Sequence, residues 1–210
     1  NGGRYRFEQV YPVEVTTQLS SGGQSTRWTV QLANGVSNPS VPAAHSVYTL
    51  AQSLTHAGAE RALPMVAFYP AARSWPVGQP SHLQAAMTQN SRKDGYDMWW
   101  EAAQSASLPL WLIAKCLERT QIAAESGARF DDVEDDELSA VNLALRAIME
   151  NFHAVKFDMK RSSLLAEWTD GRPPTAFDDF SDGQRAVIFL VSDLVRRACL
   201  LNPQLGTEVL

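Results

Sequence analysis

The most regular pattern in this chain is a run of apolar residues near its C-terminus that recurs every three or four positions. This spacing places apolar side chains on one face of a helix, and the dipeptide Asn202-Pro203 then ends it because proline cannot continue a helix. The sequence therefore predicts a long amphipathic helix with one face to bury. Its apolar positions are Val187, Leu190, Val191, Leu194, Ala198 and Leu201.

The segment at the start of this helix is the best candidate for a binding site in the chain. Its six residues are Phe180-Ser181-Asp182-Gly183-Gln184-Arg185. A serine and a glycine at a helix start present a hydroxyl, bare backbone N–H groups and the positive end of the helix dipole to one point. Gly183 has no Cβ to keep an anion from the backbone, and Gln184 and Arg185 add side-chain donors. The segment suits phosphate binding, but an ordinary N-cap at Ser181 explains the same residues equally well.

The segment resembles the Leu-Ser-Gly-Gly-Gln signature of ABC-type P-loop ATPases. The match is to the Ser-Asp-Gly variant of ABC-like AAA proteins related to the chromosome-maintenance and recombination ATPases. Residues 191–203 resemble the family's helix between the signature and the Walker B strand, and residues 63–73 resemble a family strand with an aromatic pair and a downstream arginine. The resemblance covers the last third of the chain and, more loosely, its middle.

This resemblance implies a head-to-head homodimer in which the signature loop of one subunit completes the site for ATP on the partner's P-loop. Ser181 would give its hydroxyl and amide, and Gly183 its amide, to the γ-phosphate. The parent protein would hydrolyse ATP with Mg²⁺ in DNA repair or phage defence, with DNA or an effector protein as a further partner. The implied nucleotide-binding residues are Phe180, Ser181, Asp182, Gly183, Gln184, Arg185 and, on weaker grounds, Arg73.

The chain departs from the family at two places. It has no glycine-rich loop ending in Gly-Lys-Ser/Thr, and it has no apolar strand followed by Asp-Glu. We therefore expect a piece that lies between Walker A and Walker B. ATP and Mg²⁺ would then be held mainly by regions outside this piece. The piece itself would contribute no catalytic residue and would not hydrolyse ATP alone.

A second segment, Leu19-Ser20-Ser21-Gly22-Gly23-Gln24, spells the signature more closely. Residues 27–32 after it alternate between polar and apolar, which is typical of a strand. A strand supplies no helix dipole behind the loop, so we interpret residues 20–25 as a hairpin turn.

The rest of the chain predicts an α/β class, in α+β form for this piece, with an antiparallel β region and a helical subdomain. We expect three regions, residues 1–73, 74–153 and 154–210. In the first region the patterns predict half-buried antiparallel strands over 4–33, a helix over 45–59 and a buried strand over 63–69. In the second they predict a loop over 74–90, a helical stretch over 96–126 that is interrupted at Pro109, and a helix over 138–152 that acidic residues 131–137 cap. In the third they predict strands at 155–158 and 164–168, with the chain then returning toward Phe177.

Composition restricts the partners. The net charge of −5 gives no bulk attraction for nucleic acid, and no apolar run is long enough to span a bilayer. Cys116 and Cys199 lie in apolar helical patterns, which indicates reduced thiols in a cytoplasmic protein. The four histidines, His45, His56, His82 and His153, lack metal-site spacing, so we expect no metal site.

A function of another class remains open. The aromatic helical region contains Trp99, Trp100 and Trp111, without the interleaved basic residues that base stacking requires. The chain could therefore be a non-catalytic module whose tryptophan-rich helices dock a partner, with the signature-like loop serving only as a cap.

Overall fold

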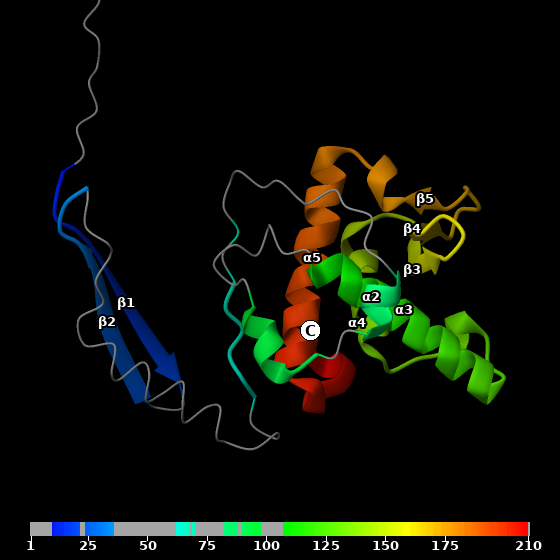
Figure 1. The fold of residues 1–210 in the computed structure, drawn as a ribbon, viewed down its shortest axis with the longest axis horizontal. Coiled ribbons are helices and arrows are strands. Elements are labelled where there is room, and N and C mark those ends of the chain that lie inside the picture. The colour runs from blue at the N-terminus through cyan, green and yellow to red at the C-terminus, as the bar shows by residue number, and fades with distance from the viewer. Residues whose placement is uncertain are drawn as a thin grey trace, which may run out of the picture. The chain divides into compact units, whose positions relative to one another are not determined.

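A computed structural model describes residues 10–21, 24–35, 62–67, 69, 82–87, 90–97 and 107–209. The described elements are helices and two small antiparallel sheets (Figure 1), so the mixed class expected from the sequence is confirmed at that coarse level. The chain divides into two compact units, residues 1–61 and 62–210. No helix in the described part of the chain is long and apolar enough to cross a membrane.

The first unit contains a β-hairpin. Strands β1 (Val13–Ser21) and β2 (Gln24–Leu32) pair antiparallel along their whole length, which confirms the predicted hairpin. The hydroxyl oxygens of Thr16 and Thr29 lie 2.9 Å apart across the pair. The predicted half-buried face is wrong at Val15, whose side chain is 58% exposed. The predicted helix over 45–59 lies outside the described residues.

In its described residues, the second unit packs four α-helices and a three-stranded sheet around one core. The core draws on buried side chains from all of these helices and from two of the strands. The sheet order is β3-β4-β5, antiparallel throughout. The elements are α2 (His82–Met87), η1 (Arg92–Tyr96), α3 (Ser107–Ser126), η3 (Phe130–Asp132), α4 (Glu137–Ile148), β3 (Phe152–Asp158), β4 (Ser163–Trp168), β5 (Thr175–Ala176), η4 (Phe177–Asp179), α5 (Asp182–Leu201) and η5 (Pro203–Val209).

The C-terminal elements confirm the sequence prediction. Helix α5 spans the predicted apolar run and ends at Leu201, with Asn202 as its C-cap. The strands predicted at 155–158 and 164–168 fall within β3 and β4. Buried residues of α5 such as Ile188 and Val195 join the core.

The strand predicted over 63–69 is wrong for the described residues, 62–67 and 69, which form no strand. The side chain of Asn202 takes the place of a neighbouring strand. Its Oδ1 accepts a hydrogen bond from the Leu63 N–H at 2.6 Å, and its Nδ2 donates to the Leu63 carbonyl at 3.1 Å. Met65 and Val66 are 44% and 45% exposed, so this apolar run is not covered on both faces.

Two helix boundaries also differ from the prediction. Helix α4 ends at Ile148, and Phe152 begins β3 instead of continuing the helix, because Asn151 between them adopts a positive φ of 58° that turns the chain. Pro109 does not interrupt a helix, since it lies in the first turn of α3, where a missing N–H leaves no gap in the hydrogen bonding.

The region predicted as a loop over 74–90 contains α2, so that prediction is wrong over 82–87. The helix is short and carries no charged residue in its first or last turn. Its buried Ala85 belongs to the core. Packing on the larger helices therefore forms a helix that local sequence does not signal.

Buried charges anchor the C-terminal half of α5. The carboxylate of Asp193 accepts hydrogen bonds from Arg196 Nε at 3.1 Å and Arg197 Nε at 2.7 Å, and all three side chains are at most 1% exposed. The Tyr69 hydroxyl donates to the same carboxylate at 2.7 Å. Arg197 Nη1 also donates to the carbonyls of Gly95 and Asp97. These bonds tie α5 to η1 and residue 69.

Side chains of α4 satisfy the free edge of β3. The buried Asn142 accepts a hydrogen bond from the Val155 N–H at 2.9 Å, and Arg146 Nε donates to the His153 carbonyl at 2.8 Å. These groups would otherwise present an unpaired edge to another strand. Helix α4 therefore protects the sheet as well as covering it.

We expect Asn142→Leu to lower the free energy of unfolding by about 1–3 kcal/mol, because leucine leaves the buried Val155 N–H without an acceptor. Urea unfolding followed by circular dichroism measures the change. Leu143→Ala, one residue along α4 at a side chain that is 55% exposed, is the matched control and should change stability by less than about 0.5 kcal/mol. Equal effects of the two substitutions would contradict this role of Asn142.

Candidate functional site

The signature-like segment forms the start of α5. Ser181 is the N-cap, and its hydroxyl oxygen accepts from the Gln184 N–H at 3.4 Å. Gln184 Oε1 accepts in return from the Ser181 hydroxyl at 2.9 Å and from the Ser181 N–H at 3.2 Å. This is a capping box, so the ordinary N-cap that the sequence left open is present and uses three of the donors that a phosphate would need.

Other donors of the segment stay open to solvent. Ser181, Asp182, Gly183 and Gln184 are all exposed, and a Cβ built on Gly183 meets no atom within 4 Å. The N–H groups of Asp182 and Gly183 belong to the first helical turn, where no intrahelical acceptor exists. Arg185 forms an ion pair with Asp182. An anion could therefore reach the backbone at the start of α5.

Phe180 holds the loop in place from inside the protein. Its side chain is 7% exposed and contacts the rings of Trp168 and Phe177 edge-on, at centroid distances of 6.0 and 6.2 Å. The structure thus brings residues 180–185 together as one loop with Phe180 as its anchor. Arg73, the seventh residue predicted for this site, lies outside the described residues.

A cavity of about 470 Å³ opens beside the loop. The end of α4, the β4–β5 connection and the first turn of α5 form its walls. Among the described residues that line it, Arg172 is the one basic residue and Glu150 the one acidic residue. The residues that line it are Ile148, Met149, Glu150, Trp168, Arg172, Gly183, Gln184 and Val187.

Sequence reasoning did not single out Arg172. Its guanidinium carbon lies 3.8 Å from the centre of the Trp168 ring, a cation–π contact. Asp170 pairs with Arg172 Nε at 3.0 Å. The signal available in the sequence was the turn Asp170-Gly171 followed by an arginine, four residues after a strand tryptophan.

A group of ionisable side chains lies on the outer face of β3 and β4. Oxygen or nitrogen atoms of Asp131, His153 and Glu167 all lie within 4.8 Å of one another. The Lys156 ammonium lies 3.3 Å from Asp131 Oδ1 and 2.8 Å from Glu167 Oε2. Although burial alone would lower the pKa of Lys156, the carboxylates of Glu167 and Asp131 raise it, so the charged lysine lies between the two acids and balances one of their two negative charges.

The end of the acidic run over 131–137 caps α4, as the sequence predicts, whereas Asp131 and Asp132 lie in η3. Asp136 is the N-cap and accepts from the Ser139 N–H at 2.8 Å. It is only partly exposed and pairs with the buried Arg119 of α3, whose Nε lies 2.7 Å from Asp136 Oδ2. Burial alone would raise the pKa of Asp136, but hydrogen bonds from Arg119 and Ser139 outweigh it and hold that pKa below its usual value.

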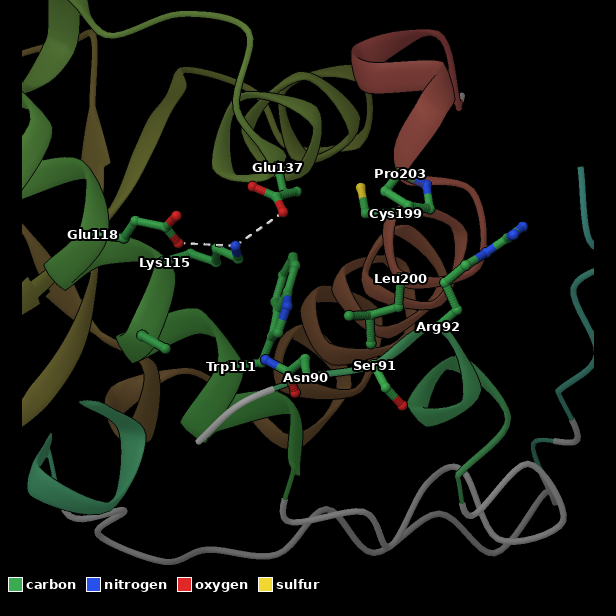
Figure 2. Close-up of a pocket in the computed structure, with 11 residues that line it drawn as sticks. Asn90, Ser91, Arg92, Trp111, Lys115, Glu118, Glu137, Cys199, Leu200 and Pro203 are labelled. Carbon is green, nitrogen blue, oxygen red and sulfur yellow. Dashed lines mark hydrogen bonds and ion pairs between the residues drawn. The ribbon is translucent and has the colours of Figure 1, made fainter. Parts of the chain in front are cut away.

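A second cavity, of about 310 Å³, lies between α3, the residues around η1 and the end of α5. Figure 2 shows Lys115 reaching toward both Glu118 and Glu137, at 2.8 and 2.9 Å. The Trp111 indole and the Cys199 thiol also line this cavity. The indole N–H has no hydrogen-bond partner among the described residues, and Trp111 is 1% exposed.

The competing segment at 19–24 lies in the β1–β2 hairpin. Its described residues are strand residues, and the chain continues into β2 without a helix. Gly22 and Gly23 lie outside the described residues. The strand context that led us to set this segment aside is confirmed.

Comparison of the chain with protein-family models and with curated proteins returns no match. The geometry of residues 180–185 and of the adjoining cavity is therefore the basis on which a function is proposed.

We expect neither cysteine to react with iodoacetamide in the folded protein at pH 8. Burial raises the pKa of Cys116 and of Cys199 to about 12, because a thiolate is disfavoured away from water. Roughly one thiol in ten thousand is then ionised at pH 8. Mass spectrometry after timed alkylation checks this, with urea-unfolded protein as the control in which both cysteines react. Rapid labelling of the folded protein would contradict it.

Proposed function

We propose that this chain is the part of an ABC-type ATPase head that supplies the signature loop, residues 180–185, to an ATP molecule held by a second copy of the protein. The observation that carries the proposal is the exposed Ser181-x-Gly183 sequence at the start of a 20-residue helix, with open space at the glycine. The cavity beside Gly183 and Gln184 leaves room for a ligand to approach from that side.

In this proposal the loop stabilises charge on the γ-phosphate. The amides of Asp182 and Gly183 and the positive end of α5 face the incoming oxygens. The Ser181 hydroxyl would turn from Gln184 toward the phosphate as the capping box opens. Transfer of the γ-phosphoryl group to water would use a P-loop, Mg²⁺ and a water-positioning group from other regions, since residues 180–185 offer donors and their one carboxylate, Asp182, is paired with Arg185.

The biological setting is a further part of the proposal. A nucleotide held between the P-loop of one subunit and the signature loop of the other couples ATP binding to homodimerisation. Such a cycle suits an ATPase that acts on DNA or switches an effector protein, as in DNA repair or phage defence. The net charge of −5 places any DNA contact on a local patch or on another subunit.

The alternative function, a non-catalytic module that docks a partner through tryptophan-rich helices, has less support. Trp111 is 1% exposed and belongs to the core, so it offers no surface to a partner. Trp99 and Trp100 lie outside the described residues. No described feature therefore favours that function over the proposed one.

The test is a pair of substitutions that both keep the N-cap. Aspartate and asparagine cap helices as well as serine does, but only aspartate places a negative charge against the phosphate. In the protein encoded by the complete reading frame, we expect Ser181→Asp to lower ATP turnover about a hundredfold or more. Ser181→Asn replaces the hydroxyl with an amide N–H that can also donate to the phosphate, so turnover should fall by less than about tenfold.

Sedimentation velocity with and without ATP and Mg²⁺ gives the second readout. ATP should shift the unsubstituted protein and Ser181→Asn toward a dimer, and it should leave Ser181→Asp monomeric. Thermal unfolding of both variants verifies that the fold is intact. Indistinguishable turnover and dimerisation for the two variants would overturn the proposal.

A further inference from the structure

We infer that Arg172 is a phosphate-contacting residue of the same site, and that it binds the polyphosphate of the nucleotide presented to residues 180–185. This inference rests on the proposed function and adds to it a residue from outside the signature-like segment. It follows from how Arg172 is held, from what surrounds it and from the geometry of a guanidinium group.

The connection between β4 and β5 positions Arg172. Gly171 has a φ of 82°, which turns the chain directly after Asp170. The Asp170 carboxylate then accepts from the Arg172 N–H at 3.2 Å and from its Nε at 3.1 Å. Among the described residues, the terminal nitrogens of Arg172 have no protein partner. The side chain is therefore fixed at Nε and open at its outer end.

The ring of Trp168 packs against the guanidinium of Arg172. The Arg172 guanidinium carbon lies 3.8 Å from the indole centre. The indole is itself fixed, because its N–H donates to Thr175 Oγ1 at 3.0 Å and its ring contacts Phe152 and Phe180 edge-on. Arg172 and the signature-like loop consequently share one rigid aromatic support.

Arg172 and the start of α5 border the same cavity. Gly183 and Gln184 form one part of its lining and Arg172 another, with the apolar side chains of Ile148 and Val187 also present. Glu150 is the one lining group of opposite charge. An anion in this cavity would meet the positive end of α5 and the open edge of the arginine together, with Glu150 as the group that opposes it.

The chemistry of arginine suits a phosphate here. A guanidinium stacked on an aromatic ring keeps its N–H donors at its edge, in the plane where two phosphate oxygens can accept together. Its side chain is 45% exposed, so a ligand can reach it. Asp170 compensates part of its charge, and removing that carboxylate should strengthen phosphate binding.

The experiment titrates the chain with inorganic tripolyphosphate and, separately, with ATP, at low salt. Isothermal calorimetry measures affinity, and ¹H–¹⁵N spectra follow the Arg172 Nε–H, the Trp168 indole N–H and the Gly183 amide. We expect all three signals to shift together. Arg172→Gln should weaken tripolyphosphate binding about tenfold or more, the loss expected for charged hydrogen bonds.

Arg161→Gln is the matched control. Arg161 lies on the other turn of the same sheet, pairs with Asp158 at 3.7 Å and is 74% exposed. The Arg161→Gln substitution removes the same charge at a place away from the cavity, so it should change the affinity for tripolyphosphate less than twofold. Asp170→Asn removes a negative charge beside Arg172 while keeping an acceptor for its Nε, and Glu150→Gln removes one from the cavity lining, so both should tighten binding.

The outcomes separate this inference from the proposed function. If Ser181→Asp abolishes binding and Arg172→Gln leaves it unchanged, the loop binds phosphate and the role of Arg172 is wrong. If Arg172→Gln weakens binding and Ser181→Asp does not, Arg172 binds phosphate without the signature loop and the proposed function fails. No binding of either probe at concentrations up to roughly 10 mM overturns the inference. Equal affinity for tripolyphosphate and ATP would mean that the site recognises the phosphates alone. Tighter binding of ATP would mean that the site also contacts the nucleoside.

Discussion

The structure of the second unit depends on the carboxylate of Asp193, which is buried between two arginines on α5. A buried charge is tolerated only when it is paired and hydrogen-bonded, and Arg196, Arg197 and Tyr69 provide that pairing. Because Arg197 also holds the carbonyls of η1, rotation of α5 would break several buried bonds at once. These bonds in the C-terminal half of α5 therefore also fix the direction in which its first turn faces.

The other end of α5 is held by rings instead of charges. Edge-on contacts run from Phe152 on β3 through Trp168 on β4 to Phe180, and from there to Phe177 and Phe189. Rings packed in this way resist sliding, since the contacts are close and directional. The loop at residues 181–185 is therefore exposed in its side chains while its anchor is part of the core, which is the arrangement that a preorganised binding loop requires.

The sequence predicted those elements whose pattern is local and failed where distant residues decide. The α5 stripe, its Asn202-Pro203 end and the two strands of the hairpin were predicted from periodicity and turn residues alone. The apolar run at 63–67 looks like a strand, but Asn202, far along the chain, takes its backbone bonds. The position of Arg172 was not visible for a related reason, because only the turn at Gly171 and the folded sheet place its guanidinium over Trp168 and in the lining of the cavity that Gly183 also borders.

The capping box and a phosphate compete for the same groups, and this competition sets what the loop can do alone. A side-chain cap stabilises a helix by about 0.5–2 kcal/mol, while a hydrogen bond to a charged group contributes about 1.5–3 kcal/mol. A phosphate can therefore displace Gln184 from Ser181, but the net gain from that exchange is small. If the loop binds nucleotide as proposed, this exchange makes binding by the loop alone weak, and stable binding would need contacts from elsewhere, first from Arg172 in the same chain and then from a second copy that holds the nucleotide.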